Sequence, residues 1–268
     1  MKYKLLVLDL DGTLTNNKKE ITEHTLRTLI DAQERGVKIV LASGRPTYGI
    51  APIAEKLELK KYGGYILSYN GGEITNWQTG ELMYENVLDA DVLPYLYQCA
   101  KENNFAIVTY KDKYVLTEHP DDEYVLKEAI LNVMETQKVD NFLEAIDFPV
   151  AKCLIVGEAT RLAVLEKEMY EVLKDRMGVY RSEPYFLELV PKGIDKAQSL
   201  AVLLEKIGAT KEEMIAVGDG FNDLSMIKFA GLGVAMANAQ EVVRQSADYI
   251  TLSNEEDGVA VVVEKFMK

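Results

Sequence analysis

The sequence predicts an α/β fold, with a Rossmann-like parallel-sheet core that is interrupted by an inserted α+β domain. Three observations lead to this prediction. The first third of the 268 residues alternates short apolar runs with helical patterns, which is typical of a parallel sheet covered by helices. The same alternation returns after Pro191, and short strand patterns separated by turns lie between the two segments. The outer segments are therefore expected to form one discontinuous domain around an insert.

The first outer segment is expected to contain three buried strands and two helices. An uncharged apolar run such as LLVL at 5–8 indicates a strand that is covered on both faces. Thr22 and Pro46 are suitable starts for the two helices, and Gly36 ends the first of them. The expected strands lie at 5–8, 37–42 and 65–68, followed by a hairpin of 73–75 and 81–84.

The insert is expected at 85–187, where acidic side chains outnumber basic ones. Its helices are expected at 89–104, 121–136 and 159–177. Its strands are expected at 105–109, 113–117, 151–156, 179–182 and 186–190. Because several of these strands are joined by short turns, we expect an antiparallel sheet with helices on one side.

The last segment restores the alternation of the first. We expect a helix at 195–207, a buried strand at 214–218, a helix from Asn222, strands at 233–235 and 249–251, and a final helix from about 258. The predicted domains are thus a core of 1–84 and 188–268 and an insert of 85–187.

Charge and cysteine content limit the possible partners. The net charge of −13 argues against binding to nucleic acid and to anionic membranes, both of which favour basic surfaces. Cys99 and Cys153 lie in apolar contexts without metal-ligand spacing, which indicates free thiols in a reducing compartment. The first apolar run ends at Asp9, too early for a signal peptide or a membrane span. We expect a monomeric cytoplasmic protein.

The first candidate for chemistry directly follows the first strand, in Asp9-Leu10-Asp11-Gly12-Thr13. In open parallel sheets, ligands bind at the carboxyl ends of the strands. Two carboxylates two residues apart suit a nucleophile with a proton donor, or a Mg²⁺ site. Asp and Gly are also common in turns, but an Asp inside the strand end, where burial is costly, favours the functional interpretation.

Three further segments lie at corresponding positions. Ser43 and Gly44 follow the second strand, where they suit either a phosphate site or a plain helix cap. A lysine in the first turn of the helix at 195–207 opposes the helix dipole, so a bound anion explains it better than structure does, although a solvated lysine is an alternative. We prefer Lys196 to Lys192 for this role because it opens the helix. The carboxylates of Asp219 and Asp223, with Asn222 between them, would repel one another without a cation.

In their order and placement these segments resemble the haloacid dehalogenase superfamily of phosphohydrolases. DLDGT, ASGR, the lysine and GDGFND occur in the order of that family, so the resemblance covers the whole chain. The insert lies between the serine and the lysine, and its size and α+β pattern resemble the type IIB cap of Cof-like sugar-phosphate phosphatases. One departure is that Ala197, instead of glycine, follows the lysine.

The resemblance implies a role for each matching residue. Asp9 would be the nucleophile that forms an aspartyl-phosphate, and Asp11 would be the general acid and base. Mg²⁺ would be held by Asp9, the backbone carbonyl of Asp11, and Asp219, with Asp223 supporting the site from behind. The implied substrate- and phosphate-binding residues are Leu10, Gly12, Ser43, Gly44, Lys196 and Asn222.

We therefore expect a Mg²⁺-dependent phosphatase that acts on small phosphorylated metabolites such as sugar phosphates, with the insert choosing the substrate. One alternative is a phosphomutase of the phosphomannomutase-like type. Another is a phosphometabolite-binding regulator without turnover, which the complete set of catalytic positions disfavours.

Overall fold

The computed structural model describes residues 2–268, and the chain divides into two units. The first unit comprises Met1–Tyr84 and Asp195–Lys268, and the second comprises Glu85–Ile194. The second unit extends beyond the expected end at 187, because strand β11 (Phe186–Pro191) pairs with strands of that unit. None of the helices in the described residues is both long and apolar enough to cross a bilayer.

The first unit is built on an eight-stranded sheet with the order β14-β13-β12-β1-β2-β3-β4-β5. It is parallel from β14 to β3, and β4 is antiparallel to β3. The strands are β1 (Leu5–Leu8), β2 (Lys38–Ala42), β3 (Tyr65–Ser68), β4 (Glu73–Asn76), β5 (Glu81–Glu85), β12 (Met214–Gly218), β13 (Leu232–Ala235) and β14 (Tyr249–Ile250).

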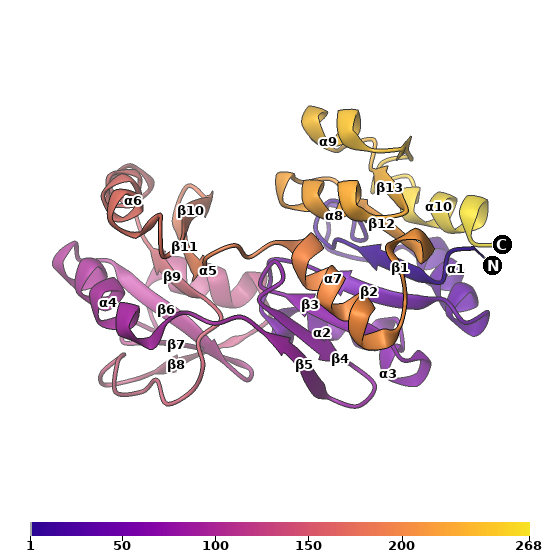
Figure 1. Ribbon diagram of the computed structural model, residues 1–268. Helices are drawn as coiled ribbons and strands as arrows, with labels where there is room; N and C mark the ends of the chain where they lie inside the picture. Colours follow the sequence, from indigo (N-terminus) through magenta and orange to yellow (C-terminus); the bar gives the residue numbers. More distant parts are fainter. Residues whose placement is uncertain (1) are drawn as a thin grey trace. The chain divides into compact units, whose positions relative to one another are not determined.

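Helices cover both faces of this sheet (Figure 1). Leu6 and Leu8 of β1 pack with α1, α2 and α10 on one face, whereas Leu5 and Val7 pack with α7 on the other. All four side chains are buried, which explains the uninterrupted apolar run in the sequence. The helices are α1 (Glu23–Glu34), α2 (Thr47–Lys56), α3 (Leu59–Tyr62), α7 (Lys196–Ile207), α8 (Leu224–Phe229), α9 (Glu241–Ser246) and α10 (Gly258–Phe266).

The second unit contains a six-stranded sheet with the order β10-β11-β9-β6-β7-β8. All its strand pairs are antiparallel except β7 with β8. Its elements are α4 (Leu93–Glu102), β6 (Ala106–Lys111), β7 (Tyr114–Thr117), α5 (Glu123–Leu131), β8 (Glu135–Lys138), β9 (Cys153–Val156), α6 (Ala159–Leu173), β10 (Met177–Glu183) and β11.

Two expectations for the second unit were wrong. The helix expected at 121–136 ends at Leu131, because Val133 adopts a left-handed φ of +54° and the chain then enters β8. The helices also do not share one side. Ile107 of β6 packs with α4 and α6, whereas Tyr110, three residues later and thus on the opposite face, donates a hydrogen bond to Glu128 of α5.

Candidate active site

The predicted site residues of the first unit gather at the carboxyl ends of β1, β2 and β12. Asp9 follows β1 directly, and its N–H donates to the carbonyl of Val217 on the neighbouring strand β12. The residue is only 6% exposed. The neighbouring Leu10 is fully buried in the hydrophobic core, so only its backbone is free to face a ligand.

Lys196 joins two of the carboxylates. Its Nζ donates to Asp9 Oδ1 at 2.8 Å, to Asp223 Oδ1 at 2.6 Å and to the Ala42 carbonyl at 2.8 Å, so all three of its protons are used. Burial alone would lower the pKa of Lys196, but the charges of Asp223 and Asp9 raise it overall, so the side chain is a cation. Lys192 belongs to the second unit and donates to the carbonyl of Asp175 instead.

Asp223 accepts three hydrogen bonds from the protein. Its second oxygen accepts from the N–H groups of Asp219 and Gly220, at 3.0 and 2.9 Å. Through these contacts Asp223 orients Lys196 and the loop of Asp219. A Cβ on Gly218 would lie 2.5 Å from the Cβ of Asp223, so this approach requires glycine.

The geometry of Asp219 depends on two residues after β1. Thr13 Oγ1 donates to Asp219 Oδ1 at 2.7 Å. Gly12 has a φ of +85°, and a Cβ there would lie 2.5 Å from Asp219 Oδ2. Burial is the main cause that raises the pKa of Asp219 to about 6. Asn238, which the sequence did not indicate, donates to the Gly12 carbonyl at 2.8 Å.

A metal ion fits the charge of this cluster. Carboxylate oxygens of Asp9, Asp219 and Asp223 lie within 4.8 Å of one another. Three buried or half-buried carboxylates share the single cation Lys196, and burial, followed by the charge of Asp223, raises the pKa of Asp9. Oxygen ligands and an excess of negative charge suit a hard divalent cation. Because Asp223 already accepts from Lys196 and from two backbone N–H groups, Asp9 and Asp219 are the side chains that would hold the ion.

Asp11 is held by two cations. Arg45 donates from Nε and Nη2 to the two Asp11 oxygens, at 2.8 and 2.6 Å, and Lys19 Nζ donates to Oδ1 at 2.7 Å. Burial alone would raise the pKa of Asp11, but these hydrogen bonds and charges lower it overall. Arg45 is thus the direct partner of the expected general acid.

The expected phosphate-binding residues beside β2 lie next to Asp9. Ser43 is 3% exposed, its N–H donates to the Leu67 carbonyl at 2.9 Å, and its Oγ accepts from the Arg45 N–H at 3.2 Å. Asn222 lies in the turn after β12 and donates from Nδ2 to Asn70 Oδ1 at 3.1 Å. Asn70, in the turn after β3, is thereby brought to the expected phosphate-binding residues.

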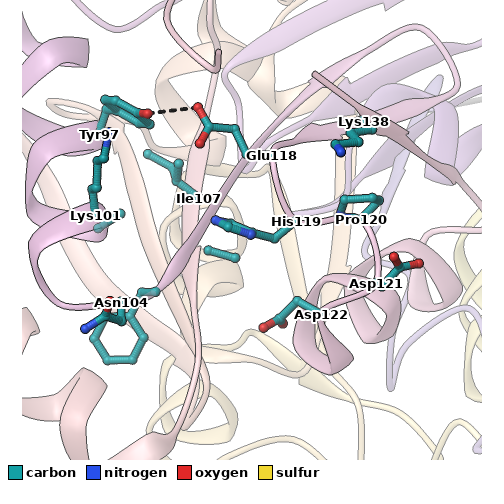
Figure 2. A pocket seen from close by; sticks show the side chains of 13 residues that line it. Tyr97, Lys101, Asn104, Ile107, Glu118, His119, Pro120, Asp121, Asp122 and Lys138 are labelled. Carbon is teal, nitrogen blue, oxygen red and sulfur yellow. Dashed lines mark hydrogen bonds between the residues drawn. The ribbon is translucent and has the colours of Figure 1, made fainter. Parts of the chain in front are cut away.

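A separate cavity of about 660 Å³ lies within the second unit (Figure 2). Tyr97 and Lys101 of α4 line one side of the cavity. Glu118, His119 and Asp122, which also line it, belong to the segment between β7 and α5. The Tyr97 hydroxyl donates to Glu118 at 2.8 Å. None of the predicted site residues lines this cavity, which is therefore distinct from the cluster at the strand ends of the first unit.

A family model described as haloacid dehalogenase-like hydrolase matches residues 6–263. The chain belongs to this family. A haloacid dehalogenase-like hydrolase from Bacteroides thetaiotaomicron is 61% identical, with a TM-score of 0.96 over 98% of this chain and 99% of that one. The family, the α/β fold class and the assignment as a phosphatase, expected from the sequence, are thereby confirmed.

Two further relatives of this hydrolase have more specific names. The 5-amino-6-(5-phospho-D-ribitylamino)uracil phosphatase YcsE of Bacillus subtilis is 32% identical, and the match covers 97% of this chain and 94% of that protein. The structure of a subclass IIB sugar phosphatase, BT4131, is 26% identical, with a TM-score of 0.81 over 98% of each chain.

Proposed function

We propose that this hydrolase is a Mg²⁺-dependent phosphatase of small phosphorylated metabolites and that it acts through an aspartyl-phosphate on Asp9. The observation that carries the proposal is the position of Lys196, whose buried Nζ joins Asp9 and Asp223 at the carboxyl end of the parallel sheet. One oxygen of Asp9 is thereby used by the lysine, and its Oδ2 is left for attack on phosphorus.

The residues around Asp9 have complementary tasks in this reaction. Asp9 Oδ2 forms a bond to phosphorus as the bond to the leaving oxygen breaks, and Asp11 supplies the proton that this oxygen takes up. Because Arg45 and Lys19 lower the pKa of Asp11, this step uses the minor, protonated form of Asp11. Ser43, the Gly44 N–H and Asn222 bind the phosphoryl oxygens, with the backbone of Leu10 and Gly12. Lys196, whose three protons are used by protein acceptors, attracts these oxygens through its charge. Water then attacks the aspartyl-phosphate, and Asp11 accepts its proton.

Magnesium would be held by Asp9, the Asp11 carbonyl and Asp219. When bound, it offsets the repulsion between the carboxylates and the incoming phosphate, and it polarises the phosphoryl group. The excess of buried carboxylates over Lys196 supports this assignment.

For the substrate, we propose a monophosphate of a sugar or a sugar alcohol. The relatives support this class, because one is named for a ribityl phosphate and another is named a sugar phosphatase. The second unit would choose among such compounds, since it contains none of the four motifs. The acidic composition favours one small phosphorylated substrate over nucleic acid, and the free thiols Cys99 and Cys153 agree with a reducing compartment such as the cytoplasm.

The test is release of inorganic phosphate from a panel of sugar phosphates, ribityl phosphates and p-nitrophenyl phosphate, with and without Mg²⁺. The proposal predicts Mg²⁺-dependent release from the aryl phosphate and from at least one polyol phosphate. A phosphomutase would move the phosphoryl group within the sugar without releasing it, and a binding regulator would release none. Either of these results would contradict the proposal.

A further inference from the structure

The turn after β3 has an unusual backbone. Tyr69, Asn70 and Gly71 have φ angles of +52°, +56° and +105° in succession. Glycine adopts this region freely and asparagine does so more readily than most residues, but a tyrosine there is uncommon. Surrounding contacts must therefore hold the turn in this conformation, which gives the Asn70 side chain a defined position.

Two backbone hydrogen bonds fix the turn to the end of β2. The Tyr69 N–H donates to the Arg45 carbonyl at 3.0 Å, and the Asn70 N–H donates to the Ser43 carbonyl at 2.9 Å. Asn70 is thus tied to the segment that contains the expected phosphate-binding residues Ser43 and Gly44.

The Asn70 side chain reaches from this segment to the turn after β12. Its Oδ1 accepts from Asn222 Nδ2 at 3.1 Å. The orientation of Asn222 is consistent with this bond. Its other amide atom, Oδ1, is directed toward Gly220 and lies 2.6 Å from the position that a Cβ on Gly220 would occupy. The Nδ2 of Asn70 lies 3.0 Å from where a Cβ on Gly44 would lie. Glycine at 44 therefore leaves room for the Asn70 amide nitrogen.

The amide nitrogen of Asn70 has unused hydrogen-bond donors. Among residues 2–268, Asn70 Nδ2 donates no hydrogen bond, although its partner oxygen on the same amide is engaged. The side chain is half-buried, and the nitrogen lies over Gly44, whose N–H is expected to bind phosphate. Solvent-directed amide donors beside an anion site are suited to bind that anion.

We propose that Asn70 is a further phosphate-binding residue, whose Nδ2 donates to a phosphoryl oxygen alongside the Gly44 N–H and Asn222 Nδ2. The inference rests on the proposed phosphatase function and extends its binding site. A neutral amide is useful here because it contributes a donor dipole without adding a proton that the neighbouring carboxylates could take.

Two substitutions separate direct binding from a purely structural role. Asn70→Gly removes the amide but suits the positive φ of the turn, so the backbone is retained. Asn70→Asp also suits this φ and keeps an oxygen that accepts from Asn222, but it replaces the donor with a negative charge. The matched control is Asn104→Gly, which makes the same change at a φ of +53° on the surface of the second unit.

The measurements are KM and kcat for p-nitrophenyl phosphate with Mg²⁺, and the dissociation constant of inorganic phosphate by calorimetry. We expect Asn70→Gly to weaken phosphate binding by about tenfold or more, as for loss of one hydrogen bond to a charged group. Asn70→Asp should weaken it further, because the new carboxylate repels the phosphate. Asn104→Gly should resemble the parent.

Parent-like phosphate affinity in Asn70→Gly would overturn the proposal. Parent-like phosphate affinity in Asn70→Asp would also overturn it. Position 70 would then contribute only an oxygen that accepts from Asn222. A parent protein that neither binds phosphate nor releases it from any ester would instead refute the proposed function. An active parent with unaffected Asn70 variants would refute only the role of Asn70.

Discussion

The guanidinium of Arg45 holds both carboxylate oxygens of Asp11, at 2.8 and 2.6 Å. Such paired contacts fix a carboxylate in position as well as in charge, and an ammonium group does not reproduce them. The residue proposed as general acid and base is therefore oriented by the segment that follows β2, in addition to its own turn.

Replacing Arg45 by lysine should consequently impair the reaction to a degree that depends on the leaving group. We expect Arg45→Lys to lower kcat/KM, which reports the phosphoryl-transfer step, by about 10- to 100-fold for sugar phosphates, whose alkoxide must be protonated. The kcat/KM of p-nitrophenyl phosphate should be affected much less, because its leaving group needs no proton. Steady-state assays with both substrates check this, with the exposed Arg27→Lys as control. Equal losses for the two substrates would show that Arg45 does not act through Asp11.

Gly12 should matter for the metal more than for folding. A Cβ at position 12 would displace the Asp219 carboxylate, the end of a side chain that is able to move. We expect Gly12→Ala to raise the Mg²⁺ concentration for half-maximal activity at least tenfold. The positive φ should cost about 1–2 kcal/mol of stability, and Gly80→Ala, with a similar φ and open space around it, should show this cost alone. An unchanged Mg²⁺ requirement in Gly12→Ala would contradict the role of Asp219.

The choice of metal should follow from the small number of available ligands. Mg²⁺ requires near-octahedral oxygen ligands and retains waters, whereas Ca²⁺ accepts more ligands and would recruit both Asp9 oxygens. We predict activation by Mg²⁺, inhibition by Ca²⁺, and a steep rise in the Mg²⁺ requirement for Asp219→Ala. Activity assays with metal-free protein test this, and full activity in excess chelator would exclude it.

Glu128 in the second unit should make stability depend on pH. It is 4% exposed and accepts from Tyr110 and Asn132, and burial is the main cause that raises its pKa. The folded state therefore binds this proton more tightly than the unfolded state, so stability should fall as pH rises above the unfolded pKa of about 4.5.

The matched variant is Glu128→Gln, which removes the charge but keeps an oxygen that accepts from Tyr110. Denaturant unfolding between about pH 4.5 and 8 should show a smaller loss of stability in this variant than in the parent. Lys152 and Glu188 also affect this region electrostatically and are present in both proteins. Identical pH profiles would mean that Glu128 stays ionised when buried.

The residues at the strand ends could be predicted from the sequence because the pattern that indicates each of them is local. An apolar strand followed by Asp9, or by Asp219 and Asp223, indicates both the strand and its carboxyl end. The pairing of Lys196 with Asp9 is less direct, since the dipole argument allowed a solvated lysine, and only the fold brings the two residues together.

Other parts of the site depend on contacts that a single sequence does not reveal. Asn70 and Asn222 are 152 residues apart in the chain, and asparagine before two glycines indicates a turn whatever its side chain contacts. Arg45 and Asp11 meet for the same non-local reason. Strand β8 was missed because the helical pattern continues past Leu131, while the chain reverses at Val133 in a conformation that valine rarely adopts.

The most direct test of the account is the turnover of Asp9→Asn with Mg²⁺ and p-nitrophenyl phosphate. This substitution preserves the size of the side chain but removes the nucleophile, whereas Asp11→Asn keeps the nucleophile and should cost only about 10²–10⁴-fold in kcat. Thermal unfolding would confirm that each variant is folded. We predict that Asp9→Asn lowers kcat at least ~10⁴-fold, on the scale of losing a covalent catalyst. A folded Asp9→Asn protein with near-parental turnover would contradict the covalent mechanism.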